Sequence, residues 1–192
     1  FDKGNNSIDN FALLDSLELN FVGSVKLGSH QELVQVINDD PIFKSPHETK
    51  LKGTKSFRVK KKVYGGERTL VVTFNQNLFN AQWLTLQNDI SKSVQKLVEL
   101  QQKLEDRANG VITRGKAPTI ESIQKQCKKH LRRQHLKHIV VTEITKGSSN
   151  IPKLKYRIDT DALHEVSNTY LGKNILITNR ENWDDAKIIT AY

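Results

Sequence analysis

Four side chains of types that bind zinc lie close together in the sequence QCKKHLRRQHLKH: Cys127, His130, His135 and His138. In a helix each residue advances about 1.5 Å along the axis, so Cys127 and His138 would lie roughly 16 Å apart. The ligands of one zinc ion lie about 2.0–2.3 Å from it. Cys127 and His130 could therefore share an ion, with further ligands from elsewhere. Because Ile123 and Leu131 share this face, we predict instead that Cys127 is a buried core residue.

The other face of this predicted helix is strongly basic. At about 100° per residue, six cations fall within one half of the helical circumference: Lys125, Lys128, Lys129, Arg132, Arg133 and Lys137. A predicted strand adds three cations on one of its faces: Arg58, Lys60 and Lys62. The like charges within such a row repel one another unless anions or water compensate them. The phosphates of a nucleic-acid backbone would provide this compensation. The alternative is an ordinary solvated surface. We favour nucleic-acid contact through phosphates, which is weakly sequence-specific.

A carboxylate stands near the start of the chain, in FDKGNNS. An Asp at the end of a strand is suited to Mg²⁺, which takes one or two carboxylates together with water and substrate phosphates. Asp2 alone cannot hold a two-metal site. The sequence contains neither the G-x-S-x-G pattern of serine hydrolases nor a G-x-x-x-x-G-K-[ST] phosphate loop. Carboxylates therefore remain as candidates, and from the local sequence Asp2 could be a Mg²⁺ ligand.

The length and composition of the chain limit which classes of protein and partner are possible. The 192 residues suffice for one substantial core or two small lobes, and they carry 36% hydrophobic and 27% charged residues with a formal net charge of +9. This charge favours polyanionic partners, although solubility alone would account for it equally well. No stretch reaches the roughly 18 apolar residues of a membrane span. A single cysteine favours a reducing, intracellular setting, and the absence of methionine leads us to expect a fragment of a longer chain.

The first part of the chain alternates between helix and strand. We predict a helix over 7–18 with Ser7 as its N-cap, a strand over 19–27, and a short helix over 30–38. The polar stretch 39–56 predicts a domain boundary. A β-hairpin follows over 56–74, with one apolar and one basic face, and Gly65-Gly66 forms its turn. This order is typical of an α/β (α+β) fold.

The middle of the chain predicts a helical hairpin. Apolar residues recur near every 3.5 positions between 78 and 107, which indicates a long helix packed lengthwise against a partner. We expect the partner to be a helix that begins at Thr119 or Ser122 and continues to Ile139; an intermolecular coiled coil is the alternative. Strands follow near 139–145, 153–159 and 173–179, the segment 161–172 is ambiguous, and a helix begins at 183–192.

Several segments, in this order, resemble the DDE transposases of bacterial insertion sequences. They are FDKGNNSIDNF, LNFVGSVKL, VYGGERTLVVTFN with the long helix, and YLGKNILITNRENWDDAKIITAY. The resemblance spans the whole chain and implies a partial ribonuclease H-like core over 1–40 and 169–192. It also implies an insertion subdomain over 41–168 that contains the β-hairpin and the helical hairpin. In this family two Asp and one Glu bind two divalent metal ions.

The resemblance assigns roles to two residues of this chain. Asp2 corresponds to the second catalytic Asp and is expected to be a metal ligand, whereas Tyr192 corresponds to the Tyr that opens the Tyr-x2-Arg-x3-Glu motif. The first Asp would precede Phe1, and the Glu would follow Tyr192. We therefore expect the chain to be a fragment of a transposase for DNA strand cleavage and transfer, inactive in isolation. Mg²⁺ or Mn²⁺ would act in the intact enzyme and would not bind tightly here.

The expected partners and setting follow from the same resemblance. The basic residues named above would contact DNA at the transposon ends, and the intact enzyme could form a homodimer. The expected location is the bacterial or archaeal cytoplasm, near the nucleoid, without membrane contact. Two other functions stay open: a non-catalytic nucleic-acid-binding module, and an interaction domain that dimerises through the apolar seam of the long helix.

Overall fold

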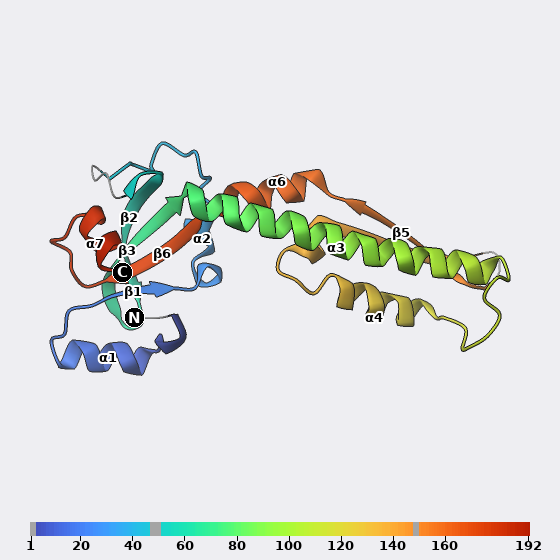
Figure 1. Ribbon diagram of the computed structural model, residues 1–192. Helices are drawn as coiled ribbons and strands as arrows, with labels where there is room; N and C mark the ends of the chain where they lie inside the picture. The colour runs from blue at the N-terminus through green and yellow to red at the C-terminus, as the bar shows by residue number, and fades with distance from the viewer. Residues whose placement is uncertain (1–2, 47–50, 148–149) are drawn as a thin grey trace. The chain divides into compact units, whose positions relative to one another are not determined.

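A computed structural model describes residues 3–46, 51–147 and 150–192. The chain forms two units (Figure 1). Unit 1 consists of Phe1–Gln82 and Asn168–Tyr192, and unit 2 is the continuous segment Trp83–Ser167. The boundaries fall within the helices α3 (Gln76–Ala108) and α6 (Thr160–Thr169). Each unit combines helices with an antiparallel sheet, so the predicted mixed α/β class is confirmed.

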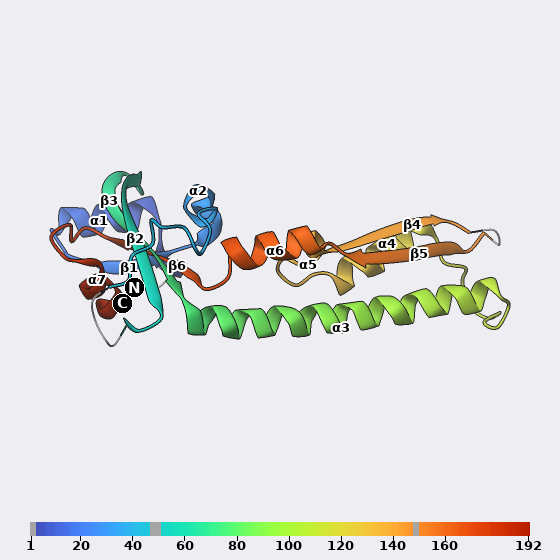
Figure 2. The same cartoon turned by 90° about the horizontal axis from the view of Figure 1, so that it is seen from above.

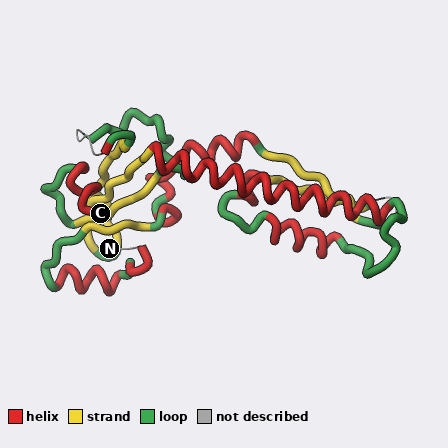
Figure 3. Tube along the Cα trace, in the orientation of Figure 1, coloured by secondary structure: helices red, strands yellow, loops and turns green. Residues whose placement is uncertain are grey.

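Unit 1 is built on a four-stranded sheet in the order β1-β6-β3-β2. Its strands are β1 (Val22–Val25), β2 (Thr54–Val63), β3 (Gly66–Asn75) and β6 (Lys173–Thr178), and all neighbours are antiparallel (yellow in Figure 3). The predicted hairpin is confirmed as β2–β3. Its turn lies one residue earlier than expected, because Tyr64 (φ 50°) and Gly65 (φ 85°) adopt the positive φ angles that a two-residue hairpin turn requires.

The hairpin belongs to unit 1, which differs from the domain boundary predicted near residue 41. β3 lies between β2 and β6, and its register aligns Val71 with Leu176. Seven consecutive residues of β3 are buried, which is typical of a strand covered on both faces. The polar stretch 39–56 is therefore a connection within unit 1. Unit 2 ends at Ser167, and the second expected boundary was at 168.

Helices lie on both faces of this sheet. On one face Leu70, Val72, Ile175 and Ile177 join a core that includes residues of α1 (Ile8–Ser16) and α2 (Gln31–Val34). On the other face Val71 and Leu176 pack with Ile188 of α7 (Asp185–Ala191). The alternation of neighbouring residues between the faces is the period of two expected of a strand.

The first and last helices, α1 and α7, each begin at a residue whose side-chain oxygen accepts a hydrogen bond from a backbone amide of the first turn. Ser7 accepts a hydrogen bond from the Asn10 amide at 3.1 Å, as predicted for an N-cap. Asp184 accepts one from the Lys187 amide at 2.7 Å and begins α7. Along the segment predicted as the first helix, Phe11 is fully buried, Leu14 is partly buried against the same core, and Leu17 is exposed.

Unit 2 contains α3 from Trp83 onward, α4 (Ile120–His130), α5 (Leu136–Ile139) and the two-stranded ribbon of β4 (Val140–Lys146) and β5 (Pro152–Ile158). The predicted long helix and its seam are confirmed, since the seam positions Ile90, Leu97 and Leu104 are all buried. Figures 1 and 2 show α3 beside α4 and the ribbon. The buried Ser93 Oγ donates to the His130 carbonyl of α4 at 3.0 Å.

The predicted partner helix is shorter than expected. Thr119 is confirmed as its N-cap, in a reciprocal capping box with Ser122. However, the helix ends at His130, and α5 begins only after His135, which has a φ of +67°. Leu131 and Leu136 are both buried but lie five residues apart, which would place them about 140° apart on one continuous helix. The break allows both side chains to face the core.

No helix among the described residues is long and apolar enough to cross a membrane.

A buried lysine links β6 to α2 within unit 1. Lys173 is 3% exposed, and its ammonium donates to the carbonyls of Val34, at 2.7 Å, and Val36. These carbonyls lie at and just beyond the end of α2, where helices leave carbonyl groups without helical partners. Burial lowers the pKa of Lys173 to about 8 from an ordinary 10.5.

This lysine predicts a pH-dependent stability. Its folded-state pKa lies below its unfolded-state value, so the unfolded chain binds more protons between pH 8 and 10.5. The wild-type free energy of unfolding should therefore rise relative to Lys173→Met as pH increases through this window, by at most about 3 kcal/mol. Urea denaturation of both proteins from pH 7 to 11 measures the difference. A difference that stays constant over this range would contradict the assignment.

Candidate functional site

The expected metal ligand, Asp2, lies outside the described residues. The chain that follows it forms the short 3-10 turn η1 (Lys3–Asn5). The side-chain amide of Asn6 then donates to the Ser24 carbonyl of β1 at 2.8 Å. At the other end of the chain, the Tyr192 hydroxyl lies 2.7 Å from Ser24 Oγ. The fully buried Ser24 therefore contacts both segments that the resemblance places next to catalytic carboxylates.

The net charge is concentrated in unit 2. Its 85 residues contain 16 Lys and Arg against 9 Asp and Glu, a formal net charge of +7. Unit 1 contains 14 Lys and Arg against 12 Asp and Glu, a formal net charge of +2. The basic character of the chain is therefore a property of the continuous segment that forms unit 2.

The six cations predicted for one helix face are all exposed, but only three lie on a helix face together. Lys125, Lys128 and Lys129 are on α4, whereas the other three lie in the connection after it or in α5: Arg132, Arg133 and Lys137. Arg133 approaches Asp89 at 3.9 Å, and the other five make no salt bridge within the described ranges. We refer to these six residues as the α4 cluster. Its charges stay available to a polyanion.

The basic face predicted for the hairpin is present but is compensated locally. Arg58 Nε donates to Asp185 at 2.7 Å, and its Nη2 donates to the Trp183 carbonyl at 2.7 Å. The Lys60 ammonium donates to Glu181 at 2.6 Å, and this hydrogen bond raises the pKa of Lys60. These acidic partners belong to the connection from β6 to α7 and to α7 itself. Arg58 and Lys60 therefore join elements of unit 1.

Lys62, the third cation of that face, is exposed. It makes no salt bridge in the part of the chain that the structure describes. The neighbouring Lys61 of β2 points to the other face of the strand and pairs with Glu32. Lys62 lies opposite Glu67 in the register of the hairpin, and of the three hairpin residues expected to contact DNA it is the one without a salt bridge among the described residues.

The cysteine and histidines of the α4 region do not form one site. Cys127 is 3% exposed, which confirms the predicted core position, and burial raises the pKa of its thiol. His138 lies on α5, with Nε2 3.2 Å from Glu165 Oε2. Burial also lowers the pKa of His130 and of His135. Over residues 3–46, 51–147 and 150–192, no group of three or more His, Cys, Asp or Glu side chains could hold a metal ion.

A second row of cations lies on the ribbon of unit 2. Lys153, Lys155 and Arg157 are exposed at alternate positions of β5, and the Leu154 side chain between them is buried. Sequence analysis identified the strand but not this row. The row could have been recognised from the segment KLKYR, in which every second residue is basic, because alternate residues of a strand lie on the same face.

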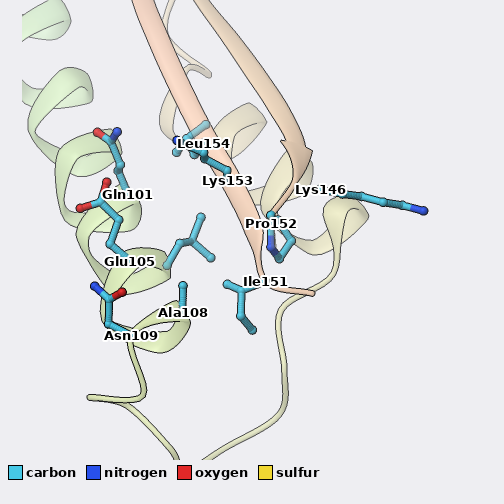
Figure 4. A pocket seen from close by; sticks show the side chains of 11 residues that line it. Gln101, Glu105, Ala108, Asn109, Lys146, Ile151, Pro152, Lys153 and Leu154 are labelled. Atoms are coloured by element: carbon cyan, nitrogen blue, oxygen red, sulfur yellow. The ribbon is translucent and has the colours of Figure 1, made fainter. Parts of the chain in front are cut away.

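Unit 2 also has a cavity of about 350 Å³ between the C-terminal end of α3 and the ends of β4 and β5 (Figure 4). Ala108 faces Ile151 and Pro152 across it, Glu105 lies on the α3 side, and the Lys146 side chain extends away from it. The lining combines apolar core residues with polar groups that do not converge. We therefore assign the candidate site to the basic surfaces and not to this cavity.

The chain was compared with models of known protein families, with curated proteins and with solved structures, and none of them matches it.

Proposed function

We propose that this chain is part of a DNA transposase of the DDE type, in which unit 2 binds DNA and Asp2 is one of three metal-binding carboxylates. The observation that carries the proposal is the net charge of +7 on unit 2, with all six residues of the α4 cluster exposed. Lys and Arg neutralise phosphates and release counterions, which supplies most of the affinity for DNA without regard to sequence. The same observation also supports a simpler function, that of a DNA-binding module without catalytic activity.

The contacts of Ser24 support the catalytic part of the proposal. The segment after Asp2 and the last residue, Tyr192, both reach Ser24 on β1. Two segments far apart in the sequence, at Asn6 and at Tyr192, are thus held at the same edge strand of unit 1. The arrangement of the units also supports a partial ribonuclease H-like core in unit 1 with an inserted unit 2. Unit 1 is formed by segments before and after unit 2, which is continuous in sequence.

In this proposal Asp2 is the chain's contribution to the metal site, as the resemblance implies. A carboxylate is the ligand type that Mg²⁺ and Mn²⁺ prefer, so the residue fits this role. In a two-metal site, the ions stabilise the attacking and leaving oxygens of a phosphodiester. The role of unit 2 is to hold the DNA backbone, and that of Ser24 is to keep the two carboxylate-bearing segments together.

The catalytic part is tested with a polypeptide that carries residues 1–192 and the native sequence on both sides. It should cleave DNA with Mg²⁺ or Mn²⁺, and Asp2→Asn should abolish cleavage while leaving DNA affinity unchanged. The 192-residue chain alone should bind DNA without cleaving it. Cleavage that persists in Asp2→Asn would refute the role of Asp2. Binding without cleavage by the longer polypeptide would assign the chain to the non-catalytic alternative.

A further inference from the structure

We infer that the outer face of the β4–β5 ribbon is a second DNA-binding surface of unit 2, whose β5 cations contact the sugar-phosphate backbone of a duplex. The cations are Lys153, Lys155 and Arg157, and we call them the β5 row. This inference rests on the proposed function and deepens it, because it adds a surface that is separate from the α4 cluster. Like that cluster, the row would contact DNA without strong sequence preference.

The register of the ribbon places the β5 row on one face. Lys155 is opposite Glu143, Lys153 is opposite Thr145, and Arg157 is opposite Val141. Residues directly opposite in an antiparallel pair point to the same side, so these six side chains share a face. All six are exposed. The alternate residues of the ribbon include the buried Val140 and Leu154, which face the core of unit 2.

The spacing of the row suits a nucleic-acid backbone. Alternate residues of a strand are about 6.6 Å apart, and one DNA strand carries a phosphate for each 3.4 Å of helix axis. Because the backbone also winds around the axis, neighbouring phosphates of one strand lie farther apart than this rise, and the cations of the row can approach consecutive phosphates.

Two of the three charges of the row have no salt-bridge partner among the described residues. Lys153 and Lys155 make no salt bridge in the described part of the chain, whereas Arg157 donates to Asp159 at 2.9 Å. Glu143 is the anion of this face. Val141 is its apolar residue, 37% exposed, and the face has no aromatic side chain. Protein interfaces are usually centred on apolar or aromatic anchors, so this face fits DNA better than another protein.

The test uses the 192-residue chain and a fluorescently labelled DNA duplex. Lys153→Gln combined with Lys155→Gln should weaken binding at least ~10-fold near 0.1 M salt and reduce the slope of log K against log salt by about 2. Glu143→Gln removes the anion from the same face and should strengthen binding by roughly a few-fold. The matched control, Lys26→Gln with Lys44→Gln, removes the same charge from exposed positions of unit 1 and should bind like the wild type. Circular dichroism and thermal unfolding verify that every variant is folded.

The outcomes separate this inference from the proposed function. If the wild-type chain does not bind duplex DNA, both are overturned. If the wild type binds and loss of the α4 cluster weakens binding, but the β5 variant and Glu143→Gln bind like the wild type, the ribbon inference alone is wrong. If the β5 variant keeps its DNA affinity but loses binding to poly-glutamate, the face belongs to an acidic protein partner and the inference also fails.

Discussion

Replacing Lys125, Lys128 and Lys129 together with Gln should weaken binding to duplex DNA by about 100-fold near 0.1 M salt. Each Lys that contacts a phosphate releases counterions and contributes roughly 0.9 to the slope of log K against log salt. The triple variant should therefore also lower this slope by almost 3. The three lysines lie on α4, are exposed and have no salt-bridge partner among the described residues. Gln has a helix propensity close to that of Lys, so α4 should persist.

The matched control removes three exposed lysines from unit 1: Lys26, Lys44 and Lys52. It has the same change in net charge as the α4 variant. If affinity depends on the total charge of the chain, both triple variants should weaken binding equally, and that result would refute a local interface. Fluorescence anisotropy titrations at several salt concentrations give the affinity and the slope for each protein.

Phe11→Ala should lower the free energy of unfolding of unit 1 by about 3–5 kcal/mol, the usual cost of removing a large buried aromatic side chain. Phe11 is fully buried in α1. Its ring stacks on Tyr64 with centroids 4.6 Å apart and meets Phe21 edge-on at 5.3 Å. The Arg68 guanidinium lies 5.7 Å from the same ring. The variant thus removes several contacts between α1, the hairpin turn and the start of β1.

Leu13→Ala is the control for this substitution, because Leu13 lies on the same helix and is 58% exposed. It should change stability by no more than about 0.5 kcal/mol. In a Trp83→Phe background, Trp183 fluorescence reports on unit 1 during urea denaturation. Equal effects of the two substitutions would show that α1 does not pack as the structure has it.

Features that depend on neighbouring residues could be predicted from the sequence. The hairpin β2–β3 follows from alternating residues around a glycine turn, and the seam of α3 follows from its apolar spacing. Ser7 was identified as an N-cap, and Thr119 as one of two possible helix starts, because a cap depends on only a few consecutive residues. The burial of Cys127 followed from its position between Ile123 and Leu131 on one face.

Features that depend on distant residues could not be predicted. The pairing of β3 with β6 joins segments about 100 residues apart, so the hairpin was assigned to the wrong side of the domain boundary. The helix breaks after His130 because Leu131 and Leu136 must both face the core of unit 2, and the local sequence does not show where that core lies. The partners of Arg58 and Lys60 come from residues 181–185, and no local pattern links them to β2.

The candidate site was predicted in part. The exposure of the α4 cluster follows from its pattern, although only half of it lies on α4. The β5 row was missed because single-strand patterns are short and the total charge does not show where the charge lies. The role of Asp2 remains a prediction, since this residue lies outside the described ranges.

The most direct test of the central claim, that unit 2 binds DNA through its phosphates, is the salt dependence of the wild-type affinity for a duplex. We predict a linear fall of log K with log salt, with a slope of about −3 or steeper, and the same slope for duplexes of unrelated sequence. An affinity that does not change between 50 and 300 mM salt, or no detectable binding at the lowest salt, would contradict the claim.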